Sequence, residues 1–401
     1  MSFDFDRPID RTGTASVKWD GRKAMFGADH ADVLPLWVAD MDFAAPEAVT
    51  RALSARAAHP IYGYTLFPDS LFTALAGWMQ RRHGWTIERE EVIWSPGVVP
   101  SLHAAVLGLT RPGEGVIVQS PVYPPFFSAV HATGRQLIEN PLRLEGDGYA
   151  MDLEYLEHCA KAARLLILCS PHNPVGRVWK PDELQAVLAI ARRHGLTVLS
   201  DEIHHDLVYP GETHTVLARL AGPGDRVITA AAPSKSFNIP GLGLSALICP
   251  DPEDRAALVR AFDQLHVSAS NPFSIAAFEA AYREGAPWLD ALLGYLAGTR
   301  AFALDLIARE CPGIRAIPPQ GTYLLWLDCR ELGLDDQALK RFFLEKPRLG
   351  LNPGISFGAP GSGFMRLNLG APHATIAEAL QRLALALRPQ PLAETSLGCK
   401  Q

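Results

Sequence analysis

The sequence predicts an α/β protein whose larger part is built around a mostly parallel β-sheet. Through the middle of the chain, short apolar runs alternate with stretches of helical period. Strands separated by helices of this length form βαβ units, and such units build parallel sheets covered by helices on both faces. The length of 401 residues exceeds one comfortable hydrophobic core, so we also expect a second, smaller domain.

Five apolar runs are the expected strands of the larger sheet, at 115–119, 165–169, 196–200, 226–231 and 244–249. Between the second and third, the segment 181–194 predicts a helix whose two ends are marked. Pro181 suits the first helical position, and the two acidic residues after it favour the positive end of the helix dipole. Basic residues at 192–194 favour the other end, and Gly195 stops the helix.

After about residue 285 the pattern changes to a long helix followed by strands and a second helix. The expected elements are a helix at 288–310, strands at 323–328 and 364–369, and a helix at 375–387. We interpret 46–285 as a large cofactor-binding domain, 1–45 with 286–390 as a smaller α/β domain, and 391–401 as a flexible tail.

Composition excludes several classes of function. A formal net charge of -6 argues against a nucleic-acid partner, whose phosphates call for a basic surface. No run of 18 apolar residues predicts a membrane span, and the acidic start MSFDFDRPID is no secretory signal. The six cysteines have no regular spacing and indicate core thiols of a reducing compartment, so we expect a cytoplasmic protein.

Polar side chains follow three of the predicted strands at the point where each strand ends. Asn173 lies just past the second strand, Asp201 comes directly after the third, and Lys235 follows the fourth. Ligands of open parallel sheets bind outside the carboxyl ends of the strands, so an amide, a carboxylate and an amine should meet in one crevice.

These three groups match the needs of pyridoxal phosphate. A lysine amine forms a Schiff base with the aldehyde once its surroundings let it become neutral. A carboxylate opposite the pyridine nitrogen keeps that nitrogen protonated, which makes the ring an electron sink. At about 3 Å and an effective dielectric near 20, this attraction is roughly 5 kcal/mol before desolvation is subtracted. We assign the amine to Lys235 and the carboxylate to Asp201.

The motifs around these residues resemble a known family. SPHNPVG (170–176), SDE (200–202) and SKSFN (234–238) are similar to the three signatures of the class I/II aminotransferase superfamily, the pyridoxal-phosphate enzymes of fold type I. The resemblance covers nearly the whole chain. It implies a large domain with a mostly parallel seven-stranded sheet, a smaller α/β domain and pyridoxal 5'-phosphate as cofactor.

Within the superfamily, the sequence most resembles the MalY/PatB branch of cystathionine β-lyase-like C–S lyases. The motifs that carry this closer likeness are PLWVADMDF (35–43), YGYT (62–65), SPGVVPSL (95–102), SPVYPPF (120–126), SDEIHHD (200–206), SKSFNIPGL (234–242), QGTYLLWLD (320–328) and FMRLN (364–368). The implied activity is β-elimination from cystathionine, cysteine or an S-substituted cysteine, giving pyruvate, ammonia and a thiol.

The resemblance also implies a role for each matching residue around the cofactor ring and the substrate. Lys235 would be the Schiff-base lysine and proton shuttle, and Asp201 would pair with the pyridinium. Asn173 would bond the ring oxygen next to the substrate, and Tyr123 would stack on the ring face. Arg366 would clamp the substrate α-carboxylate, for which a planar bidentate guanidinium is suited.

The remaining implied roles concern the backbone of the substrate site, the cofactor phosphate and the second subunit. The backbone around Ala39 would lie on the same carboxylate as the arginine. The N–H groups of Val98 and Val99, at a helix start, would hold the phosphate together with Ser234. Tyr64 would reach that phosphate from the other subunit, so a homodimer with its active site at the interface is part of the prediction.

Three positions depart from the usual aminotransferase pattern. Many members have a serine three residues before the lysine and an arginine eight residues after it, whereas this chain has Ala232 and Gly243. We therefore expect weaker cofactor retention. Aminotransferases of this class usually carry a tyrosine at the position of His204, and the lyase branch tends to have histidine there.

Other functions remain as alternatives. The same residues could serve an aminotransferase acting on a small amino acid, and a non-catalytic regulator that binds the cofactor or a partner is a second rival. GLGLSA (241–246) matches a dinucleotide fingerprint, but that fingerprint requires a following helix and the next residues predict a strand. His204, His205 and Asp206 suggest a metal site, yet neighbours on a strand or helix point different ways, so we predict none.

Overall fold

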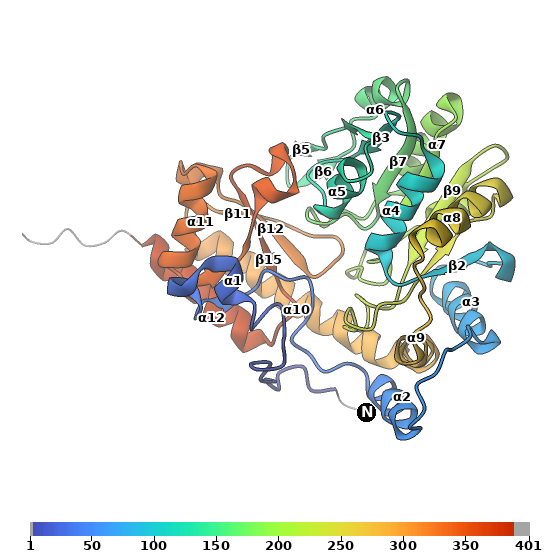
Figure 1. Ribbon diagram of the computed structural model, residues 1–401. Coiled ribbons are helices and arrows are strands. Elements are labelled where there is room, and N and C mark those ends of the chain that lie inside the picture. Colours follow the sequence, from blue (N-terminus) through green and yellow to red (C-terminus); the bar gives the residue numbers. More distant parts are fainter. Residues whose placement is uncertain (1–2, 389–401) are drawn as a thin grey trace, which may run out of the picture.

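The computed structural model describes residues 3–388, which form two main sheets and the helices that cover them (Figure 1). The expected tail at 391–401 lies outside the described residues. Five of the six cysteines are described; all five are buried and none forms a disulfide. The predicted domain limits stay a prediction, because a boundary inside one continuous fold is a matter of definition.

The larger sheet has seven strands, six of which run in the same direction. β10 is the exception and is antiparallel to both of its neighbours. The order across the sheet is β2 (Val92–Ser95), β10 (Ser245–Ile248), β9 (Arg226–Ala231), β8 (Thr197–Asp201), β7 (Ala163–Cys169), β3 (Gly115–Val118) and β4 (Gln136–Glu139). All five predicted strands are present. The sequence missed only the two edge strands of this sheet, which are less buried than the others.

Helices cover both faces of this sheet, because successive side chains of its strands point to opposite faces. Ile117, Leu166 and Leu168 join one hydrophobic core, whereas Val116 and Leu165 join the other. The first core is covered by α6 (Leu153–Ala160) and α7 (Pro181–His194), and the second by α4 (Val98–Leu109), α5 (Pro125–His131) and α8 (Pro252–Leu265). Strands buried on both faces read as continuous apolar runs, which is why the sequence revealed them.

The limits of α7 agree with the sequence prediction at both ends. Pro181 is its first residue, and the carboxylate of Glu183 accepts the backbone N–H of Lys180 at 2.8 Å. Gly195 ends the helix in the left-handed region, with φ of 66°. The local signals that predicted this helix are therefore the contacts that cap it.

The C-terminal part contains a four-stranded antiparallel sheet with the order β11 (Arg315–Ile317), β12 (Leu324–Asp328), β15 (Phe364–Asn368) and β14 (Asn352–Pro353). Its core also takes side chains from α10 (Ala286–Glu310), α11 (Asp336–Glu345) and α12 (His373–Leu387). A separate hairpin, β5 (Arg143–Glu145) with β6 (Gly148–Ala150), projects from the larger part.

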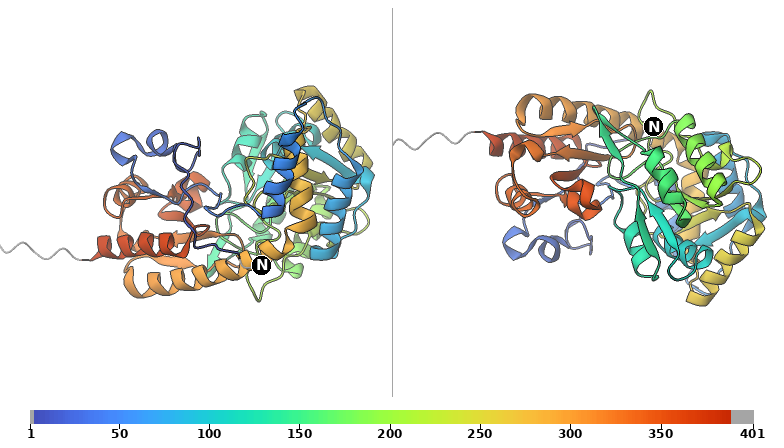
Figure 2. Two further views of the ribbon diagram at one scale, coloured as in Figure 1. Left: turned by 90° about the horizontal axis from the view of Figure 1, so that it is seen from below. Right: turned by 90° about the horizontal axis from the view of Figure 1, so that it is seen from above.

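The N-terminal segment lies along this C-terminal part (Figure 2). After the short helix α1 (Arg22–Phe26), β1 (Leu34–Pro35) pairs in parallel with β13 (Leu349–Gly350). The chain then crosses to the larger part, where α2 (Glu47–Ala58) and α3 (Asp69–His83) pack on α9 (Pro272–Glu284). The crossing segment therefore passes between the two sheets.

One helix of the described residues, α10, is long and apolar enough to span a membrane by length and composition. Its first half contributes Leu289 and Leu292 to the core around α3 and α9. Its second half contributes Ala303 and Ile307 to the core of the four-stranded sheet. Its apolar side chains thus serve two cores of the fold.

Candidate active site

Three strand ends bring the predicted amide, carboxylate and amine together. Asn173 follows β7, Asp201 is the last residue of β8, and Lys235 lies four residues after β9. These strands are neighbours in the sheet and run in parallel, so their carboxyl ends share one edge. There the three residues line a cavity of about 260 Å³. Five more predicted residues line it as well, namely Ala39, Val98, Val99, Tyr123 and Ser234.

Lys235 reaches into the cavity with a weakened preference for its charged form. Burial lowers the pKa of its amine to about 8, and the nearby cation of Arg366 adds to the effect. The amine donates a hydrogen bond of 2.6 Å to the carbonyl of Ala39. An amine with this pKa is neutral in a useful fraction of molecules near neutral pH, as a nucleophile or base requires.

Asp201 is a buried carboxylate without a cationic partner in contact. Only 5% of the residue is exposed, and burial raises its pKa to about 7. The backbone N–H of Ile203, at 3.2 Å from Oδ1, is its hydrogen-bond donor. A cation placed against this carboxylate would hold it ionised and lower its free energy.

Arg366 is a buried guanidinium whose partners are all neutral. Its nitrogens donate to the side-chain oxygens of Asn173 at 3.0 Å and Asn352 at 2.9 Å, and to the carbonyl of Trp37 at 2.7 Å. Burial lowers its pKa to about 10, and its Nε has no partner among the described residues. A buried cation in this state favours binding of an anion, and a carboxylate fits its fork.

The N-terminus of α4 provides the anion-binding end of the cavity. The N–H groups of Val98 and Val99 have no acceptor among the described residues, as is usual for the first turn of a helix. Ser234 lines the same cavity. Gly243 is a cavity residue whose added Cβ would lie 2.4 Å from the carbonyl oxygen of Pro96, so the backbone there excludes the arginine found in many aminotransferases.

The two tyrosines predicted for the site lie in different places. Tyr123 lines the cavity, and burial raises the pKa of its hydroxyl. Tyr64 does not line the cavity; it stands fully exposed, at 110% of its reference area, in the loop between α2 and α3. Every predicted site residue lines the cavity except two: Arg366 is joined to it through its bond to Asn173, and Tyr64, which the sequence assigned to the other subunit, lies apart from it.

His204 is a further cavity residue with unused hydrogen-bonding capacity. Burial, together with the cations of Lys235 and Arg366, holds its pKa well below the ordinary value, so the imidazole is neutral. Its Nδ1 has no partner among the described residues. The ring of Tyr323 lies 6.1 Å from it, centre to centre.

Sequence reasoning missed a buried polar cluster that is centred on Asp206. Asp206 accepts from Trp78 Nε1 at 3.1 Å and Ser236 Oγ at 2.7 Å, and it lies 3.0 Å from His83 Nε2 and 3.1 Å from His205 Nε2. The histidine of α3 is more than 120 residues from Asp206 in sequence, so no local motif could reveal this contact.

One argument made from the sequence is wrong here. We expected His205 and Asp206 to point different ways as neighbours on a strand or helix. They lie in a turn instead, and their ligand atoms and that of His83 fall within 4.8 Å of one another. His204 is the one that points elsewhere, into the cavity. Both oxygens of Asp206 are occupied by protein donors, which explains the cluster without an ion.

Comparisons with known proteins show the family to which the chain belongs. The family Aminotransferase class I and II matches residues 31–383. The chain is 45% identical to the cystathionine beta-lyase PatB of Bacillus subtilis (strain 168), over 96% of this chain and 99% of that protein. It is 34% identical to the protein MalY of Escherichia coli (strain K12), over 96% of this chain and 99% of that one.

A solved structure gives the same result. Cystalysin from Treponema denticola, which contains a pyridoxal 5'-phosphate cofactor, superposes with a TM-score of 0.92 at 37% sequence identity. The match covers 96% of this chain and 99% of that chain. Fold, cofactor and site geometry thus point in one direction.

Proposed function

Because the chain belongs to the class I and II aminotransferase family, we propose that it is a pyridoxal-phosphate carbon–sulfur β-lyase of small sulfur amino acids. The substrate would be cystathionine, cysteine or another S-substituted cysteine, and the products pyruvate, ammonia and a thiol.

One observation carries the proposal. An amine and a carboxylate line one cavity, and a buried guanidinium donates to Asn173 in the wall of that cavity; none of the three contacts an opposite charge. Buried charges are costly unless they are paired. The cofactor fits here because its aldehyde can take the amine of Lys235 and its ring nitrogen can face Asp201. An amino-acid substrate fits because its α-carboxylate can pair with Arg366.

The residues that would hold the cofactor all line the cavity. Lys235 and Asp201 would hold the aldehyde carbon and the ring nitrogen. The ring oxygen would meet the amide of Asn173 and the neutral imidazole of His204, and Tyr123 would lie on the ring. When bound, the cofactor supplies an electron sink that stabilises negative charge on the substrate Cα. Val98, Val99 and Ser234 would bind its phosphate.

The chain's own residues supply the proton transfer and the orientation. With a pKa of about 8, Lys235 can accept the Cα proton, a contribution of roughly 10²–10⁴-fold. The carbonyl of Ala39 restrains the Nζ atom at 2.6 Å. Arg366 would hold the substrate by its carboxylate and so restrict its orientation beside the amine.

We favour elimination over amino-group transfer because the sequence resembles the lyase branch, which tends to have histidine at position 204. The buried imidazole there is neutral. An aminotransferase would use the same lysine, aspartate and arginine, so the assay must separate the two reactions.

Incubation of the holoenzyme with L-cystathionine or S-methyl-L-cysteine tests the proposal. We expect pyruvate and a thiol without any added keto acid, and no pyruvate from L-alanine, which has no sulfur leaving group. Lys235→Ala should produce none. A strict requirement for a keto acid would instead identify an aminotransferase and overturn the proposal.

Two positions lead us to propose weaker cofactor retention than in typical aminotransferases. Ala232 and Gly243 both line the cavity, and neither offers a side-chain donor to the phosphate. Each missing hydrogen bond to a charged group is worth about 1.5–3 kcal/mol. A dissociation constant as low as that of an aminotransferase with both donors would contradict this expectation.

We also propose a cytoplasmic homodimer in which Tyr64 completes the site of the other subunit. The loop that carries it exposes large apolar side chains: Ile61, Tyr62, Leu66 and Phe67. Nearby, Leu265 and Val267 are exposed as well. Contiguous exposed apolar side chains mark interaction surfaces. Free, buried cysteines in the described residues suit a reducing compartment.

A further inference from the structure

The peptide of Ala39 faces the cavity and is held there by two donors from distant parts of the chain. Its carbonyl accepts Lys235 Nζ at 2.6 Å and Tyr323 Oη at 2.9 Å. Its N–H has no acceptor among the described residues. Because Ala39 lines the cavity, this N–H is a free donor at the cavity wall.

The segment that carries this peptide has little regular structure to hold it. Between 31 and 46, only the two residues of β1 form a strand. Side chains supply the hydrogen bonds that a neighbouring strand would otherwise provide. Asn368 donates at 2.6 Å to the carbonyls of both Val38 and Asp40. Asn238, three residues after the lysine, bonds both the N–H and the carbonyl of Met41.

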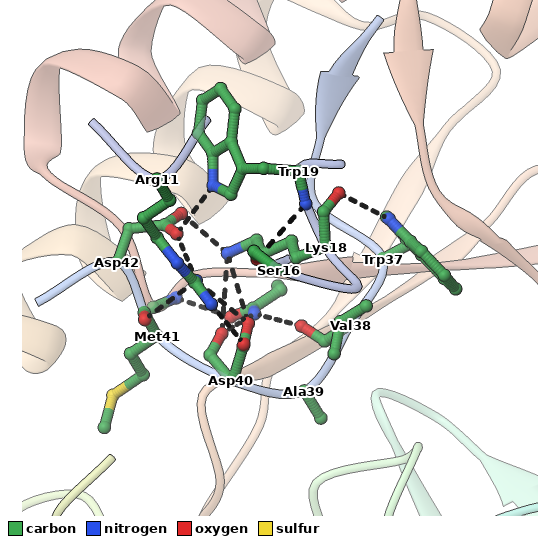
Figure 3. Close-up of polar contacts among 12 residues, drawn as sticks. Arg11, Ser16, Lys18, Trp19, Trp37, Val38, Ala39, Asp40, Met41 and Asp42 are labelled. Carbon is green, nitrogen blue, oxygen red and sulfur yellow. Dashed lines mark hydrogen bonds and ion pairs between the residues drawn. The ribbon is translucent and has the colours of Figure 1, made fainter. Parts of the chain in front are cut away.

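A compact cluster of four charged side chains completes this support (Figure 3). Arg11 bridges Asp40 and Asp42, with nitrogen–oxygen distances of 2.7 Å to each. Lys18 lies 2.6 Å from Asp42 Oδ2 and donates to the carbonyl of Asp40 at 3.4 Å. Trp19 adds a hydrogen bond of 3.0 Å to Asp42 Oδ1.

The burial of this cluster distinguishes it from ordinary surface ion pairs. Lys18 is 0% exposed, although lysine is almost never buried unless it is paired. Burial by itself raises the pKa of Asp42, but Lys18, Trp19 and Arg11 hold it below its ordinary value. Removing either cation would therefore leave a carboxylate uncompensated beside the cavity.

We propose that Arg11 and Lys18 are positioning residues for the amino-acid substrate, acting through Asp40 and Asp42 on the peptide of Ala39. Two effects follow from the geometry. The ion pairs restrain the backbone that carries Ala39, whose carbonyl bonds Lys235. The two cations also cancel the two carboxylates that follow Ala39, next to the place where a substrate carboxylate would bind. Without that cancellation, like charges would repel the substrate.

The inference rests on the proposed function only for its choice of substrate class. Its prediction concerns binding of any amino acid with a free α-carboxylate. Binding of L-alanine, which has no sulfur leaving group, can be measured by spectral titration of the holoenzyme. Failure of the lyase assay and failure of this inference are therefore separate results.

The decisive variant is Arg11→Gln, because Arg11 is 22% exposed in its side chain and the variant keeps Lys18 in place to support folding. We expect its KM and its dissociation constant for L-alanine to rise about tenfold, with kcat changed less than about twofold, the pattern of lost binding rather than lost chemistry. The cofactor dissociation constant should stay unchanged. Arg11→Lys, which keeps the charge, should recover most of the affinity.

Two further variants separate positioning from general damage. Lys18→Met should raise KM more than Arg11→Gln, provided that it folds. Arg348→Gln is the matched control. It removes an ion pair between Arg348 of the C-terminal part and Asp32, which lies in the N-terminal segment just before β1. Its KM should equal that of the wild type. A folded Arg11→Gln holoenzyme that binds L-alanine as tightly as the wild type would overturn the inference.

Discussion

At the scale of single residues, the site is defined by charges that have lost water without gaining a counter-charge. Lys235, Asp201 and Arg366 each have a pKa displaced by burial toward the neutral form. Perturbed ionisation in one cavity is typical of catalytic sites. The sequence predicted these three residues because each lies on or just after a strand that reads as a continuous apolar run or a family motif.

The lowered pKa of Lys235 gives a prediction for the cofactor-free protein. Only the neutral amine attacks an aldehyde, and the amine becomes neutral as pH rises through its pKa. The rate at which pyridoxal phosphate modifies Lys235 should therefore rise with pH, with a midpoint of about 8. Stopped-flow absorbance measures it, with Lys235→Ala as the blank. A midpoint near the ordinary lysine value of 10.5 would exclude this environment.

Asp206 should be more important for stability than for chemistry. Burial by itself raises its pKa, but His205 and His83 hold it well below 3.8. This contribution is present above the unfolded pKa and is lost as pH falls through the folded one. Burial also lowers the pKa of His205, yet Asp206 raises it overall, so that contribution is lost as pH rises through the folded pKa.

Asp206→Asn should therefore lower the free energy of unfolding by about 3–5 kcal/mol at pH 5.5, as for a buried pair that loses one partner. The difference from the wild type should be smaller at pH 8.5 than at pH 5.5, because rising pH removes the charge that Asp206 stabilises on His205 in the folded state. Urea denaturation at the two pH values measures this. A difference that grows with pH would contradict the assignment of charges.

At the scale of elements, the local sequence signals that predict a helix or strand are also the ones that stabilise it. The strands of the large sheet and helix α7 could be predicted because apolar runs, acidic first turns and a terminal glycine act within a few residues. Edge strands β2 and β4 are only partly buried, and their apolar runs of two or three residues lie between charged or polar neighbours. The cluster of Arg11, Lys18, Asp40 and Asp42 was missed because only the folded segment brings those side chains together.

A pair of glycine substitutions tests the role of helix ends. Gly195 caps α7 at φ of 66°, and an added Cβ there would meet nothing within 4 Å. Gly195→Ala should therefore destabilise the protein by about 1–2 kcal/mol through backbone strain alone. Gly294, inside α10 and equally free of neighbours, is the opposite case.

Gly294→Ala should stabilise the protein by about 0.5–1 kcal/mol, because alanine favours the helix interior. Thermal denaturation of the two variants, measured side by side, decides the matter. Equal effects of the same sign would show that conformation at these positions does not control stability.

At the scale of the whole molecule, we propose that a second copy of the chain completes the active site. Tyr64 is fully exposed and does not line the cavity, and large apolar side chains of the loop around it are exposed as well. The proposed role of Tyr64 comes only from the family resemblance, since no periodicity or spacing within one chain encodes a contact with a second copy. The N-terminal crossing, by contrast, is visible in one chain as the pairing of β1 with β13.

Leu66→Asp tests the proposed dimer. Leu66 is 85% exposed in the single chain, where a charge would change stability by less than about 0.5 kcal/mol. In a dimer the same charge would be buried, so we expect sedimentation to show dissociation and the cofactor to be lost more readily. Leu385→Asp is the control, because Leu385 is an exposed side chain on α12. Identical behaviour of the two variants would remove the argument for this interface.

The most direct test concerns the bond between the protein and its cofactor. Borohydride reduction of the holoenzyme, followed by proteolysis and mass spectrometry, should place a pyridoxyl group on Lys235 and on no other lysine. Lys235→Ala treated in the same way should carry none. A tag found on another residue, or no tag on a protein that still cleaves its substrate, would contradict the account.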